Sequence, residues 1–432
     1  MPRSDQNKMR PQDRAVHDWY RFVLSYPPHL VQDYLDRFGM SLSNTVLDPF
    51  CGTGTTLVEC KKRCVGSVGV EPNPMAHFAS SVKVAWKVDP SALLDYADVV
   101  AAWARKRFKR EGINEWRDLP LFAGNGEPQV PLQGLRPEQA KLLLKNSISP
   151  LPLHRALVLL EAIDGHGDRQ LRRYGRLALA NALVHRIGNL KFGPEVGVGP
   201  IKEDAPVVDI WREGMKTIIR DLRLVRDRMD VPARVLKADA RGTDQFLAPN
   251  SVDAVITSPP YPNEKDYTRT TRLESVVLGL IRDRREMRSM KQNLLRSNSR
   301  GVYKADADDR EVAEHAEIQR LAADIEKRRV ELGKTSGFER LYPRVTQLYF
   351  GGMARHFASL RPALRPGAKL AYVVGDQASY LRVMIRTGQL LADIAQSLGY
   401  KIINIDLFRT RPSTVTGEQL REEVVLLEWP GT

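Results

Sequence analysis

A strand, a glycine-rich turn and a helix start follow one another around residue 50, and this order constrains the fold more than any other feature. Val46-Leu47-Asp48 is typical of a short strand, and Gly52 and Gly54 follow in the turn. Glycine permits positive φ and lets a ligand approach the backbone closely. Thr55 is suited to cap the helix that begins there. The unit therefore predicts the ligand-binding turn of an α/β protein.

A second strand, Val68-Gly69-Val70, ends at the acid Glu71. An acid at the end of the second strand of an α/β unit commonly accepts hydrogen bonds from ribose hydroxyls. The preceding turn lacks the G-x-G-x-x-G spacing of dinucleotide sites and the Gly-Lys-Ser/Thr of phosphate-binding loops. A nucleoside cofactor without a pyrophosphate therefore fits this unit better.

Residues 252–261 form an apolar run that stops at a hydroxyl, two prolines and an aromatic ring. Pro259 and Pro260 cannot continue a strand ladder, because proline has no N–H donor and its φ is fixed. The strand end is thus open, and carbonyl and hydroxyl oxygens lie beside the ring of Tyr261. This suits an exocyclic amine on a heterocyclic base, with the oxygens accepting its protons and the ring stacking on the base. The simpler alternative is a Pro-Pro turn.

Taken together, these motifs resemble the S-adenosylmethionine-dependent DNA amino-methyltransferases of the N4-cytosine/N6-adenine group. D-P-F-C-G-T-G-T-T, from Asp48, resembles the cofactor loop of that family, and T-S-P-P-Y, from Thr257, resembles its catalytic tetrapeptide. Serine at the first position is more typical of N4-cytosine enzymes, whereas adenine enzymes usually carry Asp or Asn. The resemblance implies S-adenosyl-L-methionine as cofactor and favours the N4 amine of a flipped-out cytosine. Adenine N6 and an RNA base are the alternatives.

The resemblance also assigns roles to single residues. Residues 25–31 resemble the segment that closes over the methionine end of the cofactor, and Asp239 looks like the acid that contacts the adenine. Phe50 is expected to face the methionine, with core packing as an equal alternative. The implied catalytic residues are Ser258, Pro259, Pro260 and Tyr261, and the implied cofactor-binding residues are Tyr26, Pro27, Asp48, Pro49, Phe50, Gly52, Gly54, Thr55, Glu71 and Asp239.

The formal net charge of +14 indicates a polyanionic partner, and a nucleic acid is the natural one. The resemblance makes this partner double-stranded DNA and allows for a cognate restriction endonuclease. Asp266 and Tyr267 are expected to shape the base pocket. A one-sided basic run follows, which favours contact with DNA phosphates over a solvated helix face. The candidate DNA-binding residues are Arg269, Arg272, Arg284, Arg285, Arg288 and Lys291.

Other classes of protein are disfavoured by composition. No run of eighteen apolar residues predicts a membrane span, and the first residues lack the apolar core of a signal peptide. Three cysteines in 432 residues favour a reducing compartment, hence a cytoplasmic protein. Their spacing is not that of a zinc site, so no metal is expected. Cytosine-C5 enzymes use a Pro-Cys nucleophile, and this sequence has no such dipeptide.

Alternating strands and helices predict an α/β fold with a mostly parallel seven-stranded sheet covered on both faces, interrupted by helical insertions. The resemblance implies that this is the Rossmann-like methyltransferase fold. The last strand is expected to be an antiparallel hairpin partner, and residues 381–398 are expected to be helical. Residues 188–199 are interpreted as a connector. The two insertions are expected to pack into one lobe facing the active cleft. The expected parts are an N-terminal arm and cofactor-lid segment at 1–40, a catalytic core at 41–74, 233–261 and 346–432, a helical insertion at 75–232, and a basic helical insertion at 262–345 as candidate target-recognition region.

Overall fold

A seven-stranded sheet forms the centre of the protein in a computed structural model that describes residues 9–22, 25–113, 130–193, 195–262, 266–412, 417 and 419–431. The strand order is β5-β2-β1-β6-β7-β9-β8. The strands are β1 (Thr45–Asp48), β2 (Gly66–Val70), β5 (Ala233–Leu236), β6 (Val252–Thr257), β7 (Leu364–Gly375), β8 (Lys401–Pro412) and β9 (Gln419–Trp429).

The sheet is parallel except for β9. β1 pairs in parallel with β2 and β6, β2 pairs with β5, and β6 pairs with β7. β9 lies antiparallel between β7 and β8. The predicted α/β fold, with a mostly parallel seven-stranded sheet and an antiparallel last strand, is confirmed.

The chain changes its direction across the sheet between β1 and β6. β2 and β5 lie on one side of β1, whereas β6 and β7 lie on the other. Loops that leave the carboxyl ends of β1 and β6 therefore diverge. Open α/β sheets bind ligands at such a switch point, outside the carboxyl ends of the strands.

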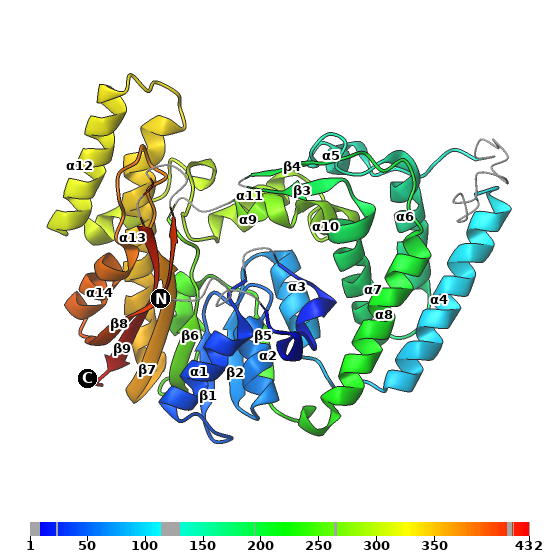
Figure 1. Ribbon diagram of the computed structural model, residues 1–432, viewed down its shortest axis with the longest axis horizontal. Coiled ribbons are helices and arrows are strands. Elements are labelled where there is room, and N and C mark those ends of the chain that lie inside the picture. The colour runs from blue at the N-terminus through cyan, green and yellow to red at the C-terminus, as the bar shows by residue number, and fades with distance from the viewer. Residues whose placement is uncertain are drawn as a thin grey trace.

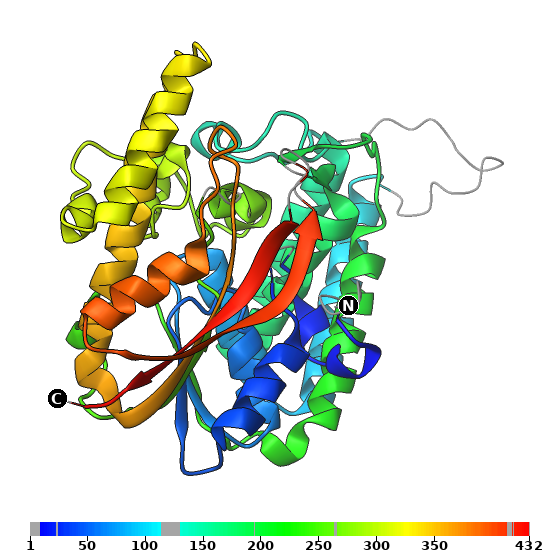
Figure 2. The ribbon, with the colours of Figure 1, turned by 60° about the vertical axis from the view of Figure 1, so that its left-hand side comes forward.

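Helices cover both faces of the sheet (Figures 1 and 2). Val46 packs with α1 on one face, whereas its neighbour Leu47 packs with α13 and α14 on the other, because side chains alternate along a strand. The helices of the described residues are α1 (Pro28–Phe38), α2 (Thr55–Lys62), α3 (Pro74–Lys83), α4 (Pro90–Arg110), α5 (Pro137–Ala140), α6 (Pro150–Gly165), α7 (Arg169–Ala182), α8 (Val207–Leu224), α9 (Tyr267–Thr270), α10 (Arg272–Val277), α11 (Arg284–Gln292), α12 (Ala316–Glu331), α13 (Tyr342–Leu360) and α14 (Thr387–Ser397).

Local sequence signals fix several helix ends. Pro28 occupies the first turn of α1, where its missing N–H costs nothing, and Gly39 ends the helix with a φ of 66°. The Asn73 side chain caps α3 by accepting from Met75 N at 3.0 Å. Asp89 caps α4 in the same way.

A bundle of α4, α6, α7 and α8 stands beside the β2 and β5 edge of the sheet (Figure 1). Their apolar faces share one core cluster, which includes Val100, Leu159 and Trp211. The N-terminal arm is fastened to this bundle by the buried Asp221 of α8. Its carboxylate accepts from Val16 N at 2.9 Å and from Trp19 Nε1 at 3.0 Å.

The basic region beyond the tetrapeptide divides between two cores. Leu273 and Val277 of α10 join the cluster of the bundle, whereas Ile318 and Ile325 of α12 join the cluster of α13 on the sheet. The expectation of one common lobe is therefore wrong for α12, which projects beside α13 (Figure 2). The apolar residues Ile318, Leu321, Ala322 and Ile325 of α12 are buried, whereas Leu332, just after the helix, is 43% exposed.

Two further sequence expectations are corrected by backbone geometry. The helix expected over residues 381–398 begins only at Thr387, since Leu381 and Arg382 have φ values of 57° and 70°, in the left-handed region. Residues 188–199 are more than a connector, because β3 (Leu190–Phe192) and β4 (Val196–Val198) pair there as a hairpin.

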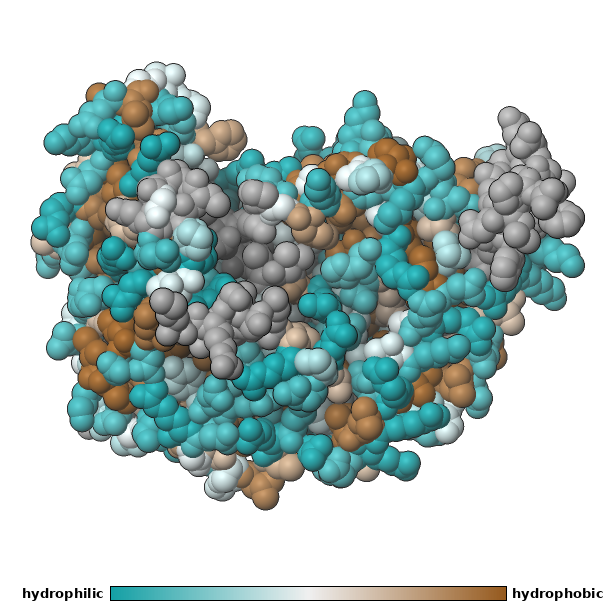
Figure 3. Space-filling view, viewed as in Figure 1, coloured by the Kyte–Doolittle hydropathy of each residue, from teal (hydrophilic) through white to brown (hydrophobic). Residues whose placement is uncertain are grey.

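Hydrophilic residues cover most of the surface in the view of Figure 3, and apolar residues form only scattered patches. None of the helices in the described part of the chain is long and apolar enough to cross a membrane. Hydrophilic side chains therefore dominate what this face offers to a partner.

Candidate active site

A cavity with about 1170 Å³ of empty space, partly open to solvent, lies where the loops after β1, β2, β5 and β6 meet. It thus occupies the switch point of the sheet. Its walls come from these strand ends, from the N-terminal arm and from the segment after α11. The lining residues are Phe22, Ser25, Tyr26, Phe50, Cys51, Gly52, Thr53, Thr55, Glu71, Pro72, Asn73, Ala76, Asp239, Ala240, Ser258, Pro260, Asp266, Thr268, Thr271, Lys291, Asn293, Leu294, Leu295, Arg296, Ser297, Asn298 and Gly301.

The turn after β1 needs its glycines. Gly52 and Gly54 have φ values of 50° and 85°. A Cβ on Gly54 would also lie 3.0 Å from the Cβ of Ser80. Cys51 N donates to Val70 O at 3.1 Å and holds the turn against the end of β2. The predicted Gly52 and Thr55 line the cavity, whereas Gly54 supports the turn from behind.

Glu71 lies at the cavity wall, at the end of β2, where the sequence predicts it. Its side chain is buried and accepts from Gly52 N at 3.0 Å and from Asn73 N at 2.8 Å. Burial raises the pKa of Glu71 to about 7. Each carboxylate oxygen accepts one backbone N–H, so lone pairs remain for ligand hydroxyls.

Asp48, one of the implied cofactor-binding residues, does not line the cavity. It is fully buried and accepts from Thr257 Oγ1 at 2.6 Å, from Phe50 N at 3.1 Å and from Tyr26 OH at 3.3 Å. Burial raises its pKa to about 6. Asp48 therefore joins the end of β6, the turn after β1 and the Tyr26 segment. Of its predicted companions, Tyr26 and Phe50 line the cavity, and Pro27 and Pro49 do not.

Phe50 lies between the cavity and the core. It lines the cavity and also meets the ring of the buried His356 edge-on, with 5.0 Å between ring centres. His356 Nδ1 lies 2.8 Å from Ala240 O and Nε2 lies 2.7 Å from Tyr372 OH. Burial lowers its pKa to about 4, so the imidazole is neutral and rigidly held behind the cavity wall.

The tetrapeptide places Ser258 and Pro260 on the cavity wall. Ser258 Oγ donates to Val373 O of β7 at 3.1 Å, which leaves its lone pairs to accept from a ligand. Pro259 and Tyr261 do not line the cavity. The Tyr261 ring packs on Gly375, where an added Cβ would lie 2.9 Å from the ring.

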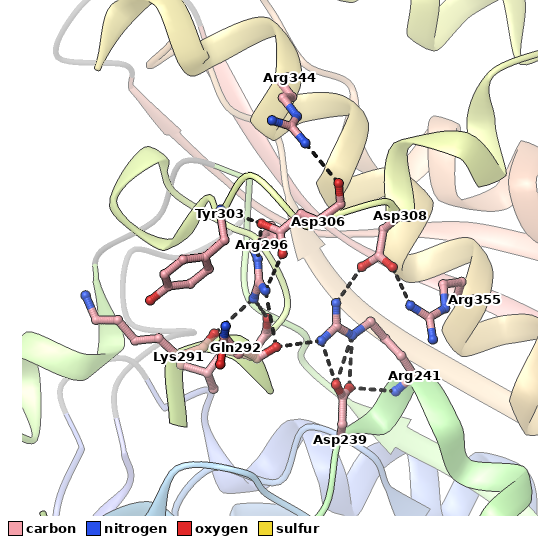
Figure 4. A network of polar contacts seen from close by, with 11 residues as sticks. Asp239, Arg241, Lys291, Gln292, Arg296, Tyr303, Asp306, Asp308, Arg344 and Arg355 are labelled. Carbon is pink, nitrogen blue, oxygen red and sulfur yellow. Dashed lines mark hydrogen bonds and ion pairs between the residues drawn. The ribbon is translucent and has the colours of Figure 1, made fainter. Parts of the chain in front are cut away.

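Asp239 lines the cavity as predicted, but it is held by a network that sequence reasoning missed (Figure 4). Its carboxylate accepts from Arg241 Nη2 at 2.6 Å and from Arg241 N at 2.9 Å. Arg241 also pairs with the buried Asp308 at 2.5 Å and donates to Gln292 O at 3.1 Å. The carboxyl end of β5 is thereby tied to residues far along the chain.

The segment after α11 forms the part of the wall that no sequence motif indicated. Arg296, with a side chain only 4% exposed, donates to both oxygens of Asp306 at 2.8 and 2.7 Å (Figure 4). Arg296 Nη2 also donates to Gln292 O at 3.2 Å. These bonds hold residues 293–298 against the cavity. In the sequence, the only sign of this contact is an arginine followed ten residues later by an aspartate, Arg296 and Asp306.

Lys291 also differs from its expected place on a DNA-facing surface. It lines the cavity with its Nζ 3.5 Å from an oxygen of Asp266, and the two side chains are 17% and 6% exposed. Asp266 accepts from Thr268 N at 3.0 Å and from its hydroxyl at 2.6 Å. Asp266 therefore shapes the cavity as expected, while the side chain of Tyr267 lies outside the described residues.

The other predicted DNA-binding arginines fall into two sets. Arg284, Arg285 and Arg288 are exposed on α11. Arg269 instead pairs with Glu195 of the β3–β4 hairpin at 2.8 Å. Arg272 donates to Thr268 Oγ1 at 3.2 Å, and burial lowers its pKa. The exposed arginines of α11 can therefore contact a polyanion at the surface.

The three free cysteines, Cys51, Cys60 and Cys64, take no part in a metal cluster. Within the described ranges, no group of three or more His, Cys, Asp or Glu side chains is placed to hold a metal ion. Burial raises the pKa of the Cys51 thiol well above its usual range, so Cys51 is a protonated wall residue.

Type II methyltransferases are similar to this chain along nearly its whole length. M.BsoBI of Geobacillus stearothermophilus is 25% identical, over 97% of this chain and 86% of that protein. M.AvaI of Nostoc sp. (strain PCC 7120) is 21% identical, over 92% and 81%. M.MjaII of Methanocaldococcus jannaschii is 31% identical over 71 residues, which is 16% of this chain and 13% of that protein.

No protein-family model matches the chain. Among solved structures, TrmN from Thermus thermophilus is 10% identical, with a TM-score of 0.32 over 98% of this chain and 54% of that one, too weak a likeness to inform the fold. The long alignments with M.BsoBI and M.AvaI show that the similarity is not confined to two motifs. The predicted resemblance to methyltransferases is therefore confirmed.

Proposed function

We propose that this protein is a site-specific DNA methyltransferase that moves a methyl group from S-adenosyl-L-methionine to the exocyclic N4 amine of cytosine. One observation carries the proposal: the open strand end at Ser258 and the acid Glu71 face the same cavity, in a chain similar to type II methyltransferases over almost its full length. This arrangement supports placing the amine that receives the methyl group and the nucleoside cofactor in one chamber.

The residues present fit the cofactor. Glu71 offers carboxylate lone pairs to the two ribose hydroxyls, and Asp239 and Phe50 lie on the same wall. Residues proposed for the cofactor and for the base thus line one cavity at the switch point of the sheet. When bound, S-adenosyl-L-methionine supplies a methyl group activated by a sulfonium leaving group.

On the base side, the chain positions the amine. Ser258 Oγ and the Pro259 carbonyl accept the two amine protons, which favours a pyramidal nitrogen with its lone pair aimed at the methyl group. The Ser258 proton is already engaged by Val373 O, so its oxygen acts as an acceptor. Direct in-line displacement then rests on positioning, and no covalent intermediate is needed.

Base flipping brings the cytosine into this chamber at a cost of a few kcal/mol. Stacking on Tyr261, which follows Pro260 of the cavity wall, and backbone contacts by the exposed arginines Arg284, Arg285 and Arg288 are proposed to offset that cost. The net charge of +14 supplies sequence-independent attraction to duplex DNA. A restriction endonuclease of the same specificity would be the natural partner.

The proposal is tested by incubating the purified protein with duplex DNA and labelled S-adenosylmethionine, followed by mass spectrometry of the nucleosides. We expect N4-methylcytosine. If N6-methyladenine forms instead, the protein is an N6-adenine methyltransferase that uses the same chemistry. A parallel arm with tRNA tests the RNA alternative. Ser258→Ala should lower the rate about 10- to 100-fold, since one hydrogen bond to the reacting amine is lost.

The matched control is Ser251→Ala, because Ser251 precedes the other end of β6 and its hydroxyl donates to Ala248 O at 2.6 Å, away from the cavity. It should leave the rate unchanged. Near-normal rates in both Ser258→Ala and Tyr261→Ala would remove the tetrapeptide from the mechanism. Unchanged cofactor affinity in Ser258→Ala would show that the loss lies in transfer rather than in binding.

A further inference from the structure

A second cavity adjoins the first and shares five of its lining residues. The shared residues are Phe22, Ser25, Tyr26, Thr53 and Thr55. The remaining wall includes His17 and Arg21 of the N-terminal arm and Lys83, the last residue of α3. Tyr26 and Thr55 therefore lie where the two cavities adjoin.

Lys83 is a buried cation without a partner among the residues that the structure describes. The residue is only 2% exposed and lines the second cavity. Its Nζ forms no hydrogen bond or ion pair with any part of the chain that the structure describes. Burying an unpaired ammonium costs several kcal/mol. Burial accordingly lowers the pKa of Lys83 to about 7.

The carboxylates near Lys83 are already engaged elsewhere. Asp18 pairs with Arg14 at 3.4 Å and with Arg21 at 3.7 Å. Glu59 is held by His17 at 2.7 Å and by Lys62 at 2.8 Å. Lys62 and Arg21 oppose the charge of Lys83, and only Asp18 favours it. The second cavity thus carries an uncompensated positive charge.

The N-terminus of α2 adds to this charge. Its N-cap is Gly54, so no side chain caps the first turn, and Thr53 and Thr55 lie on the wall of both cavities. The free N–H groups of a first helical turn attract anions, and the helix dipole has the same effect. Lys83 and the first turn of α2 therefore border one small positive chamber.

We propose that Lys83 and the first turn of α2 bind the carboxylate of the methionine part of the cofactor. This inference rests on the proposed function. Because Lys83 is only 2% exposed, a slender group attached to a molecule in the adjoining first cavity suits it as a partner. A phosphate of duplex DNA would need Lys83 to be exposed. Tyr26 lies between the two cavities, in the segment expected to cover the methionine end.

The test compares two neutral thioether ligands by titration calorimetry. S-adenosyl-L-homocysteine carries the amino-acid group, and 5′-methylthioadenosine has the same nucleoside without it. Lys83→Met should weaken S-adenosyl-L-homocysteine about 10- to 100-fold, because a charge-assisted hydrogen bond is lost. It should leave the affinity for 5′-methylthioadenosine unchanged.

The matched control is Lys87→Met, which removes an exposed lysine four residues further on that pairs with Asp230 at 2.7 Å. It should leave both affinities unchanged. Without ligand, Lys83→Met should melt at the same or a higher temperature, since an unpaired buried charge is replaced by an apolar chain of similar length. Loss of binding is then separated from loss of folding.

Equal weakening of both ligands by Lys83→Met, or no weakening of either, would overturn the assignment of the carboxylate. Binding of neither ligand by the unsubstituted protein would overturn the proposed function, and this inference with it. Unchanged affinity of Lys83→Met for a short DNA duplex is expected, and a large loss there would assign Lys83 to phosphate instead.

Discussion

At the scale of single residues, Glu71 is a buried acid whose charge state decides what it can bind. Its pKa rises from 4.5 to about 7 in the protein without ligand. Because the folded-state pKa is the higher one, protonated Glu71 stabilises the fold fully below about pH 4.5. This contribution is lost as the pH rises through about 7. Removing Glu71 therefore changes both stability and binding in a defined pH window.

We expect the affinity for 5′-methylthioadenosine to rise about tenfold between about pH 6 and about pH 8, because only the carboxylate accepts two ribose hydroxyls. Glu71→Gln should bind more weakly and show no such rise. Over about pH 4.5 to 7, wild type should lose unfolding free energy relative to Glu71→Gln. Calorimetry and urea denaturation at several pH values measure the two effects. Identical pH profiles for the two proteins would exclude Glu71 from the cofactor site.

The residues that could be predicted from sequence are those that end parallel strands. Gly52, Glu71 and Ser258 each follow a strand, and the carboxyl ends of parallel strands meet at one edge of a sheet. Lys83 and Arg241 could not be found in this way. Residues of the N-terminal arm line the cavity beside Lys83, and Arg241 pairs with Asp308, 67 positions further along the chain. No local sequence pattern indicates either contact.

At the scale of elements, Arg241 joins the end of β5 to the segment between α11 and α13. Arg241 and Asp308 have side chains only 9% and 5% exposed, and Arg241 also holds Asp239. We expect Arg241→Gln to lower the free energy of unfolding by about 3–5 kcal/mol, because the buried Asp308 then keeps only the exposed Arg355 as an ion-pair partner and Asp239 loses its ion pair. Hydrogen exchange should rise over residues 292–308. Denaturant titration and exchange mass spectrometry measure both.

Arg355→Gln is the matched control for this network. Arg355 pairs with the same Asp308, but its side chain is 47% exposed. Exposed ion pairs contribute at most about 1 kcal/mol, so this variant should stay close to wild type in stability. Equal losses in the two variants would mean that Asp308, rather than the link through Arg241, holds the segment.

Element types were predicted more securely than element ends. Short apolar runs identified the strands because a sheet covered on both faces buries every residue of its central strands, as in β2. The helix expected from residue 381 starts later because Leu381 and Arg382 adopt left-handed backbone. The segment after α11 had no periodic pattern, and buried ion pairs rather than apolar contacts place Arg296 beside the cavity.

At the scale of the whole molecule, the sheet, the N-terminal arm and the segment after α11 surround one chamber. The exposed basic residues are not spread evenly around this chamber. The exposed arginines of α11 lie in the basic region that also lines the chamber, whereas the basic residues of α8 lie on the bundle (Figure 1). A DNA duplex whose base enters the chamber should therefore meet α11 and not α8.

This difference predicts how salt affects DNA binding. The logarithm of the association constant falls with the logarithm of salt concentration by about 0.9 for each neutralised phosphate of duplex DNA. Replacing Arg284, Arg285 and Arg288 by Gln should lower the magnitude of this slope by about 3 and weaken binding to all sequences alike. The control replaces Lys216, Arg223 and Arg226, which are exposed on or just after α8, and removes the same charge. Fluorescence anisotropy between about 50 and 200 mM salt measures both. If the two triple variants change the slope equally, net charge alone governs binding and α11 is not the DNA-facing element.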